Sequence, residues 1–405
     1  MAEYHLPQAP YVLTVPDGYV NRLDMEGFSL MLKDPSYCYK FYWLEALVRI
    51  ISRGERETDF GGVIDEMIVN AWYSVLGFHI HLSGTAGGEI RDGLERAVTE
   101  TARLSGLGAE ASPDAVRRAL REYAPALKKC REQLTNMVPY RALAGFFRLS
   151  GEMPPWDSPV RMTAFIRRVN AECVTLPYTL GDGRRLEKEV RFHPVWAEML
   201  RGNAVSVLGW IQYEKIKWLQ TNNPEVPGLV YKLSLPDEKM RRLSNARKLW
   251  TGIMETVPVR DLYSGAPLTA KEYDLDHFIP WSFTMSDELW NLAPADASLN
   301  AAKNNRLPRW DVFFPGFAGN QYLLYRLKEE RRPIRALYMS CLKDNMHSLW
   351  AEQQLYRPGN TREEFVAILE KNMRPVYDSA RIQGYEIWNY PGAAGRPSCA
   401  GKGNE

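Results

Sequence analysis

Residues 261–308 have the sequence DLYSGAPLTAKEYDLDHFIPWSFTMSDELWNLAPADASLNAAKNNRLP, and this stretch decides the fold that we expect around it. Its residues 273–280 alternate as on a β-strand, and the proline at position 280 would end that strand. After a loop, Ser298 is a favourable N-cap for a short helix that contains Asn300. The stretch therefore predicts a β-hairpin followed by a helix.

Two neighbouring residues of this strand have the chemistry of a hydrolytic site. A regular strand would point Asp276 and His277 to opposite faces. To serve one site, either the strand end bends or bulges, or the two side chains reach a metal region differently. A following helix would bring Asn300 close to Asp276. Asp and Asn offer hard oxygen ligands, which suit Mg²⁺ or Mn²⁺ better than zinc. A neutral histidine beside such a cation takes a proton from water near neutral pH, as phosphodiester hydrolysis requires.

The order Asp276-His277, Asn291, Asn300, followed by Lys303, resembles the HNH endonuclease family in its H-N-N variant, whose fold is the ββα-metal finger. The resemblance implies that His277 is the general base and that Asp276 and Asn300 hold the divalent metal. It also implies that Asn291 holds the loop and orients the His277 ring through its other nitrogen. Lys303 would contact phosphate or brace the helix. The cut would leave a 3′-hydroxyl and a 5′-phosphate.

The block departs from many relatives, which bind a structural zinc through two pairs of cysteines. Residues 261–265 contain no cysteine, and the five cysteines of the chain form no C-x-x-C pair. We therefore expect Mg²⁺ or Mn²⁺ as the cofactor, no structural zinc, and a finger held by packing. The candidates for this packing are Trp281, Phe283, Leu289, Trp290, Leu292 and Leu299.

Basic residues cluster on both sides of the block, although the whole chain has 51 basic and 49 acidic residues and a net charge of only +2. Residues 211–260 hold nine Lys and Arg against five Asp and Glu, and residues 301–335 hold eight against three. A basic surface for nucleic acid would therefore be local. The candidate contacts are Lys303, Arg306, Arg309, Arg241, Arg242 and Lys248, and for each the alternative is an ordinary solvated helix face.

Elsewhere, hydrophobic periodicity predicts helices over most of the chain. Helical spacing starts at Gly62 and again at Glu89, and Ser112 is a favourable N-cap. A helix is expected from about Pro236 to Glu255, and a C-terminal helix is expected to be interrupted at Pro375.

We therefore expect a mainly α, multi-domain protein, with helical N- and C-terminal regions around a small ββα-metal finger. Residues 174–192, with a Gly-Asp-Gly turn, predict a hairpin, and the loop at 222–228 could mark a boundary. The expected segments are a helical N-terminal domain at 1–172, a hairpin with a basic helical connector at 173–257, the nuclease finger at 258–312, C-terminal helices at 313–390 and a disordered tail at 391–405.

The sequence leaves the substrate, the partners and the role of residues 1–250 open. DNA is the expected substrate, and the block 273–308 resembles bacterial HNH nucleases associated with phage defence, so proteins of such a system are candidate partners. The alternatives are an RNase or toxin of the HNH type, and a nucleic-acid-binding module with a regulatory helical domain. One site cuts one strand, so a double-strand cut requires a homodimer or two encounters. No apolar run has spanning length, and we expect a cytoplasmic protein.

Overall fold

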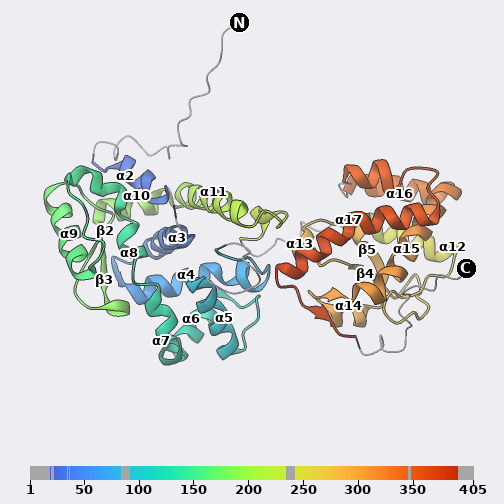
Figure 1. Ribbon diagram of the computed structural model, residues 1–405, viewed down its shortest axis with the longest axis horizontal. Coiled ribbons are helices and arrows are strands. Elements are labelled where there is room, and N and C mark those ends of the chain that lie inside the picture. Colours follow the sequence, from blue (N-terminus) through green and yellow to red (C-terminus); the bar gives the residue numbers. More distant parts are fainter. Residues whose placement is uncertain are drawn as a thin grey trace, which may run out of the picture. The chain divides into compact units, whose positions relative to one another are not determined.

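The computed structural model describes residues 19, 22–33, 35, 37–83, 92–233, 242–344 and 348–390. The chain forms two compact units, Met1–Pro224 and Glu225–Glu405 (Figure 1). The boundary between them falls inside the loop at 222–228 that the sequence marks. The connector expected at 173–257 is instead divided between the units, because its hairpin pairs with an N-terminal strand and its basic helix packs in the C-terminal core.

The N-terminal unit is helical apart from one small sheet. The sheet has the strand order β1-β3-β2 and is antiparallel, which confirms the hairpin expected at 174–192. The strands are β1 Glu57–Asp59, β2 Tyr178–Leu180 and β3 Glu189–Phe192. The helices are α2 Met25–Ser29, α3 Tyr39–Ser52, α4 Phe60–Leu76, α5 Gly93–Ser105, α6 Pro113–Glu122, α7 Ala124–Gln133, α8 Val138–Arg141, α9 Pro159–Glu172, α10 Pro194–Gly202 and α11 Ala204–Asn222.

Side-chain caps fix where several of these helices begin. The Asp59 carboxylate accepts the N–H of Gly62 and starts α4, whose predicted apolar face is buried. Asp92 caps α5, so this helix begins at Gly93 rather than at Glu89, which lies outside the described residues. Ser112 caps α6, as its sequence predicts.

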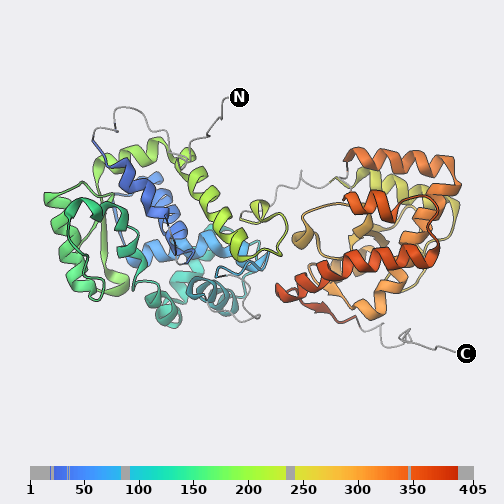
Figure 2. The same cartoon turned by 45° about the horizontal axis from the view of Figure 1, so that its top comes forward.

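The C-terminal unit is mainly helical (Figure 2) and contains two small two-stranded sheets, one antiparallel and one parallel. Its strands are β4 Asp274–His277, β5 Leu292–Ala295, β6 Leu307–Pro308 and β7 Ile387–Trp388. Its helices are α12 Ser244–Thr256, α13 Trp281–Thr284, α14 Ala297–Lys303, α15 Trp310–Glu330, α16 Arg332–Asp344 and α17 Arg362–Ile382. The antiparallel pair β4–β5 and the short helix α14 form the expected ββα unit, and the protein is mainly α, as predicted.

One predicted interruption is wrong. Helix α17 continues through Pro375, and α15 likewise contains Pro315. A proline inside a helix removes one backbone hydrogen bond. Packing offsets this loss in α17, because Met373 and Tyr377 on either side of the proline are buried in the core. The Tyr377 hydroxyl also donates to the Pro308 carbonyl at 2.7 Å.

Aromatic side chains clamp the end of β4 into the core of the C-terminal unit. Phe278, the residue after His277, is fully buried. Its ring centroid lies 4.6 Å from that of Phe317 and 5.8 Å from that of Trp310, both on α15. The expected packing residues Trp281, Phe283, Leu289, Trp290 and Leu292 are buried, and Leu299 is half-buried. Packing of this kind fixes the backbone on which His277 stands.

Two further expectations from the sequence concern the C-terminal tail and membrane-spanning segments. The tail at 391–405, expected to be disordered, lies outside them. Within the described part of the chain, no helix combines the length and the apolar character that crossing a membrane requires.

Candidate active site

Asp276 and His277 stand on a regular part of β4. Asp276 pairs with Ala293 and His277 pairs with Leu292, in an unbroken antiparallel register. The ladder of backbone hydrogen bonds continues past β4, since the N–H of Phe278 donates to the Asn291 carbonyl at 2.9 Å. The strand therefore does not bulge at these residues. Both side chains are nevertheless buried, with residue exposures of 5% and 6%, because the protein covers both faces of the strand end.

The Asp276 carboxylate is held by two side chains. Its Oδ1 accepts a hydrogen bond from Lys303 Nζ at 2.9 Å, and its Oδ2 accepts one from the Tyr263 hydroxyl. Burial raises the pKa of the Tyr263 phenol well above its ordinary value, and the charge of Asp276 raises it further, so the phenol stays a proton donor. Tyr263 was not among the residues expected from the sequence.

Lys303 braces the helix α14 against β4. Its ammonium donates to Asp276 Oδ1 and, at 2.8 Å, to the backbone carbonyl of His277, and the residue is only 1% exposed. Of the two roles expected for Lys303, its contacts are those of bracing. The expected contact with phosphate has no support here, since the ammonium lies inside the protein on a buried carboxylate.

The His277 ring has a carboxylate partner. Its Nε2 lies 2.9 Å from Oδ1 of Asp287, and the two side chains are 7% and 6% exposed. The second oxygen of Asp287 accepts the backbone N–H of Arg242 at 2.7 Å. Asp287 lies in the loop between α13 and β5 and was not singled out from the sequence.

Asn291 is fully buried and pairs with the backbone of one residue. Its Oδ1 accepts the N–H of Ile279 and its Nδ2 donates to the carbonyl of Ile279, both at 2.8 Å. These two hydrogen bonds tie the end of β4 to the start of β5, which is the contact expected of a residue that holds the loop. The orienting role expected at His277 is not supported, because both ends of the amide are used on Ile279 while Nε2 of His277 lies on Asp287.

Asn300 lies half-buried on α14, which packs against β4. The N-cap of this helix is Asp296 and not Ser298 as expected: the Asp296 carboxylate accepts the N–H groups of Ser298 and Leu299 at 2.9 and 3.1 Å. A carboxylate is a stronger acceptor than a hydroxyl at this position. The cap places Asn300 in the first turn of the helix, on the element that Lys303 attaches to Asp276.

Asp261 joins two segments of the ββα unit through hydrogen bonds of its carboxylate. One carboxylate oxygen accepts the N–H of Tyr263 and the N–H and hydroxyl of Ser264. The other accepts the N–H of Asp296 at 2.8 Å. Asp261 is 2% exposed. Its carboxylate thus joins the turn that carries Tyr263 to the N-terminus of α14.

The remaining candidate contacts for nucleic acid differ in exposure. Arg306 folds back onto the carbonyls of Ala302 and Lys303, so it caps the C-terminus of α14. Arg309 is exposed and pairs with Asp311 at 3.1 Å. Exposed side chains also occur at Arg242 and Lys248, whereas Arg241 lies outside the described residues.

The oxygen ligands expected of a Mg²⁺ or Mn²⁺ site lie on β4 and α14. Within the described ranges, no three His, Cys, Asp or Glu side chains form a metal cluster, so a cation here would need the Asn300 amide oxygen beside the Asp276 carboxylate. That carboxylate already faces one cation, Lys303 Nζ. A carboxylate has about four lone-pair positions, so its bonds to Tyr263 and Lys303 leave room for a metal. The donor set fits a hard divalent cation rather than zinc.

The ββα unit carries the histidine, the aspartate and the asparagine on β4 and α14. Residues 261–309 match the family model described as HNH endonuclease. The chain therefore carries a domain of the HNH endonuclease family, and members of this family generally use a divalent metal. No curated protein matches the chain. The match covers the ββα unit and leaves the N-terminal unit without an assignment.

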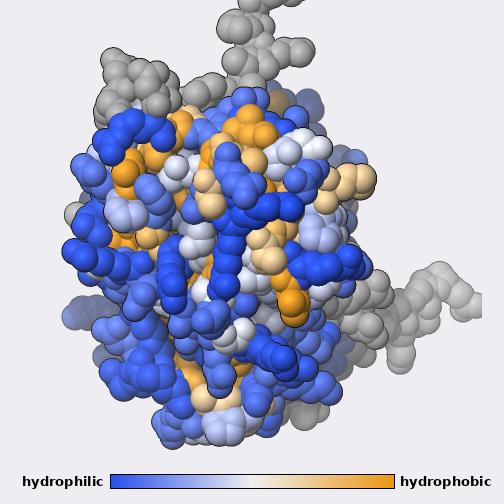
Figure 3. Space-filling model, turned by 90° about the vertical axis from the view of Figure 1, so that its left-hand side faces the viewer, coloured by the Kyte–Doolittle hydropathy of each residue, from blue (hydrophilic) through white to orange (hydrophobic). Residues whose placement is uncertain are grey.

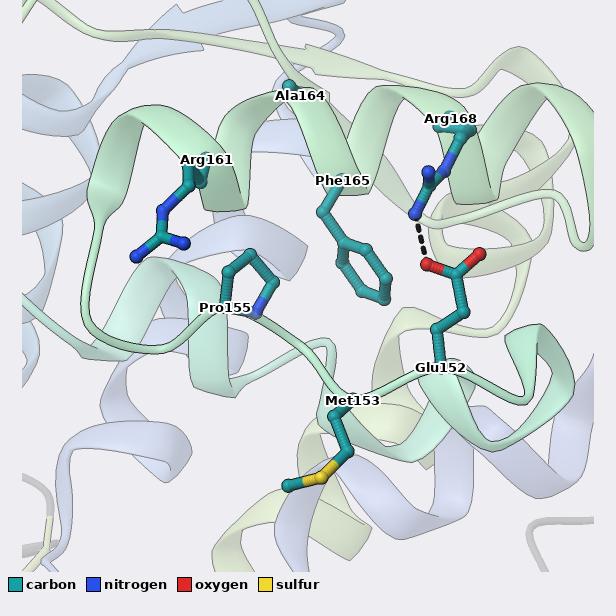
Figure 4. A pocket seen from close by; sticks show the side chains of 7 residues that line it. All are labelled: Glu152, Met153, Pro155, Arg161, Ala164, Phe165 and Arg168. Carbon is teal, nitrogen blue, oxygen red and sulfur yellow. Dashed lines mark hydrogen bonds and ion pairs between the residues drawn. The ribbon is translucent and has the colours of Figure 1, made fainter.

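A separate pocket lies in the N-terminal unit, beside α9 (Figure 4). Phe165 and the exposed side chain of Met153 contribute to its wall. Its two arginines are neutralised, since Arg168 pairs with Glu152 and Arg161 pairs with Asp157. The face of this unit that carries α9 is mostly hydrophilic, with small apolar patches (Figure 3). The pocket therefore lacks the charge that phosphate recognition requires.

Proposed function

We propose that the C-terminal unit hydrolyses phosphodiester bonds of DNA, with His277 as the general base and with Asp276 and Asn300 holding one Mg²⁺ or Mn²⁺. The observation that carries this proposal is the buried Asp276-His277 strand end, attached by Lys303 to the helix that bears Asn300, within the segment that matches the HNH endonuclease family. The family match supports a nuclease, and the residue roles and the substrate are our proposal.

The reaction consumes one water molecule per bond. His277 takes a proton from water, and the oxygen of that water attacks phosphorus. The bond between phosphorus and the 3′-oxygen breaks, the leaving oxygen takes a proton from solvent and His277 returns its proton to solvent, which gives a 3′-hydroxyl and a 5′-phosphate. A bound divalent cation would neutralise charge on the phosphate and on the leaving oxygen.

The protein environment prepares His277 for this step. The ring stands at the end of a strand whose next residue is clamped in the aromatic core, so its backbone position is fixed before substrate binds. Positioning of this kind reduces the entropy that the reaction must lose. The exposed Arg242, Lys248 and Arg309 are the residues that we propose for contacts with the phosphate backbone.

The direct test is cleavage by the full-length protein of supercoiled plasmid, linear DNA, single-stranded DNA and total RNA, with Mg²⁺, with Mn²⁺ and with a chelator. We expect cleavage of DNA that requires the metal, and a loss of about 10²–10⁴-fold in His277→Ala. A metal-dependent cut confined to RNA would favour the RNase or toxin reading. Binding without cleavage on every substrate would favour a nucleic-acid-binding module. Full activity in His277→Ala would overturn the assignment of the base.

We further propose that this activity serves anti-phage defence and that the N-terminal unit restrains or directs it. The support is the resemblance of residues 273–308 to defence-associated HNH nucleases, together with a separate helical unit of unassigned role. Cells that express the wild type should resist phage, and cells that express His277→Ala should not. Residues 225–405 alone should differ from the full chain in rate or target choice, and identical behaviour would contradict the restraining role.

The same cleavage assay reports on assembly. A single site cuts one strand, so a monomer produces nicked circles first and linear DNA only after a second encounter. A homodimer that acts on both strands would convert supercoiled plasmid directly to linear product. Comparison of these two product series with the mass of the protein in solution distinguishes the two arrangements.

A further inference from the structure

The ring of His277 and the carboxylate of Asp287 form a buried pair at the end of β4. Nε2 of His277 lies 2.9 Å from Oδ1 of Asp287, and neither side chain is more than 7% exposed. An ionised carboxylate only accepts hydrogen bonds, so the proton between these atoms belongs to Nε2. In a neutral imidazole the other nitrogen is then without a proton and has a lone pair to accept one.

We propose that Asp287 is the positioning residue of the catalytic histidine, and that it leaves Nδ1 of His277 as the nitrogen that accepts the proton of the attacking water. This inference rests on the proposed hydrolytic function of the domain. The carboxylate fixes the tautomer and the angle of the ring, and its charge stabilises the imidazolium that forms when water gives up its proton.

The surroundings of Asp287 hold its carboxylate in place. Its second oxygen accepts the backbone N–H of Arg242 at 2.7 Å, so rotation of the carboxylate away from His277 would break this bond as well. The next residue, Glu288, accepts the N–H of Ser348 at 2.8 Å and its hydroxyl at 2.9 Å. Two neighbouring acidic side chains thus attach the loop between α13 and β5 to the segments at 242 and 348.

The backbone that leads into this loop is strained in the manner of a functional turn. Met285 has a φ of +52°, in the left-handed region that a side chain rarely adopts. This turn ends α13 and is followed, two residues later, by Asp287. Such conformations persist where the surrounding contacts determine them, often near functional sites. Here the hydrogen-bonded side chains of Asp287 and Glu288 follow directly after the turn.

A carboxylate at this place acts differently from the amide that the family pattern suggests. An amide presents both an acceptor and a donor, and a flipped Asn would donate to Nε2 and move the ring proton to Nδ1. Asn291 is engaged on both sides by Ile279 and does not take this role. The two tasks that the sequence assigned to one residue are therefore divided, with Asn291 holding the loop and Asp287 holding the ring.

The test reads the tautomer of His277 directly, by ¹⁵N–¹H correlation NMR of the full chain with labelled histidine. The His277 signals are assigned by their loss in His277→Gln. We expect the wild type to have a protonated Nε2 and a bare Nδ1, and Asp287→Asn to have a mixed or reversed tautomer. The same variant should cleave roughly 10- to 100-fold more slowly, mainly in kcat. Asp378→Asn, the same change at an exposed ion pair on α17, should alter neither result.

Each outcome supports or overturns the inference. A wild-type ring protonated on Nδ1, or a tautomer that Asp287→Asn leaves unchanged, would overturn it without any need for the variant to be active. Faster cleavage by Asp287→Asn would also overturn it, because Asp287 would then be blocking the base. If the wild type cleaves no nucleic acid, the proposed function fails, while the NMR measurement still reports whether Asp287 holds the ring.

Discussion

Replacement of Lys303 by Met tests the bracing role most directly. The change keeps the length of the stem but removes the ammonium that bonds to Asp276 Oδ1 at 2.9 Å and to the His277 carbonyl at 2.8 Å. Lys303 and Asp276 are both buried, so the variant leaves an uncompensated carboxylate inside the protein. Breaking a buried pair in this way costs about 3–5 kcal/mol. That is a large part of the roughly 5–15 kcal/mol by which a domain is stable.

Urea denaturation followed by tryptophan fluorescence measures this loss. With a slope of about 2 kcal/mol per molar urea, the midpoint of the C-terminal unit should fall by roughly 1.5–2.5 M. Lys371→Met is the matched control, because Lys371 is exposed on α17 and its replacement should change the free energy of unfolding by less than about 0.5 kcal/mol.

A second substitution separates the charge from the packing. If the unpaired Asp276 carboxylate causes the loss, Asp276→Asn in the Lys303→Met background should recover part of the stability, since it removes the buried charge. The reasoning would be refuted if Lys303→Met were as stable as Lys371→Met and bound DNA more weakly. That result would place the ammonium of Lys303 on phosphate, which is the role that its burial argues against.

Three further predictions follow from single contacts. Burial lowers the pKa of Lys232 from 10.5 to about 7. At pH values between these two pKa values, the Lys232 side chain is therefore more fully protonated in the unfolded chain than in the folded chain. Stability should therefore rise with pH by at most about 1.4 kcal/mol per unit, and Lys232→Met should lose this slope in urea titrations between about pH 7 and about pH 9. Parallel slopes would contradict it. Asp261→Ala leaves the N–H groups of Tyr263, Ser264 and Asp296 without their acceptor and should lower the free energy of unfolding by about 1–3 kcal/mol, because the N–H of Tyr263 is buried; an unchanged urea midpoint would count against the crosslink. For DNA binding by catalytically inactive protein, Lys248→Gln should reduce the dependence of log affinity on log salt by about 1, and an unchanged slope would identify Lys248 as an ordinary solvated residue.

The residues that we propose for catalysis could be selected from the sequence because they lie close together in it. Asp276, His277, Asn291 and Asn300 fall within one short ββα unit, where strand alternation and turn residues largely fix the local geometry. The same local chemistry predicted Asp and Asn as oxygen ligands. The expected packing of Trp281 and its neighbours followed from their apolar character alone.

The partners of these residues could not be predicted, because tertiary packing selects them. Asp287 resembles an ordinary loop carboxylate in the sequence, which does not show that its partners are His277 and the backbone of Arg242. Tyr263 gave a weak signal: a tyrosine that is buried needs a partner for its hydroxyl, but the sequence does not show that the partner is Asp276. Asp261 likewise accepts from Asp296 at the start of α14, and no spacing rule connects them.

The strand end at Asp276-His277 decides between two alternatives that the sequence left open. We expected either a bent or bulged strand end or side chains that reach a metal region differently. The strand is regular, and the protein instead covers both of its faces: the Asp276 carboxylate meets Lys303 and Tyr263, while the His277 ring meets Asp287. The strand ends directly afterwards, where Phe278 is fixed in the core. The bend or bulge is therefore excluded, and the alternative in which the two side chains reach a metal region differently stays a prediction.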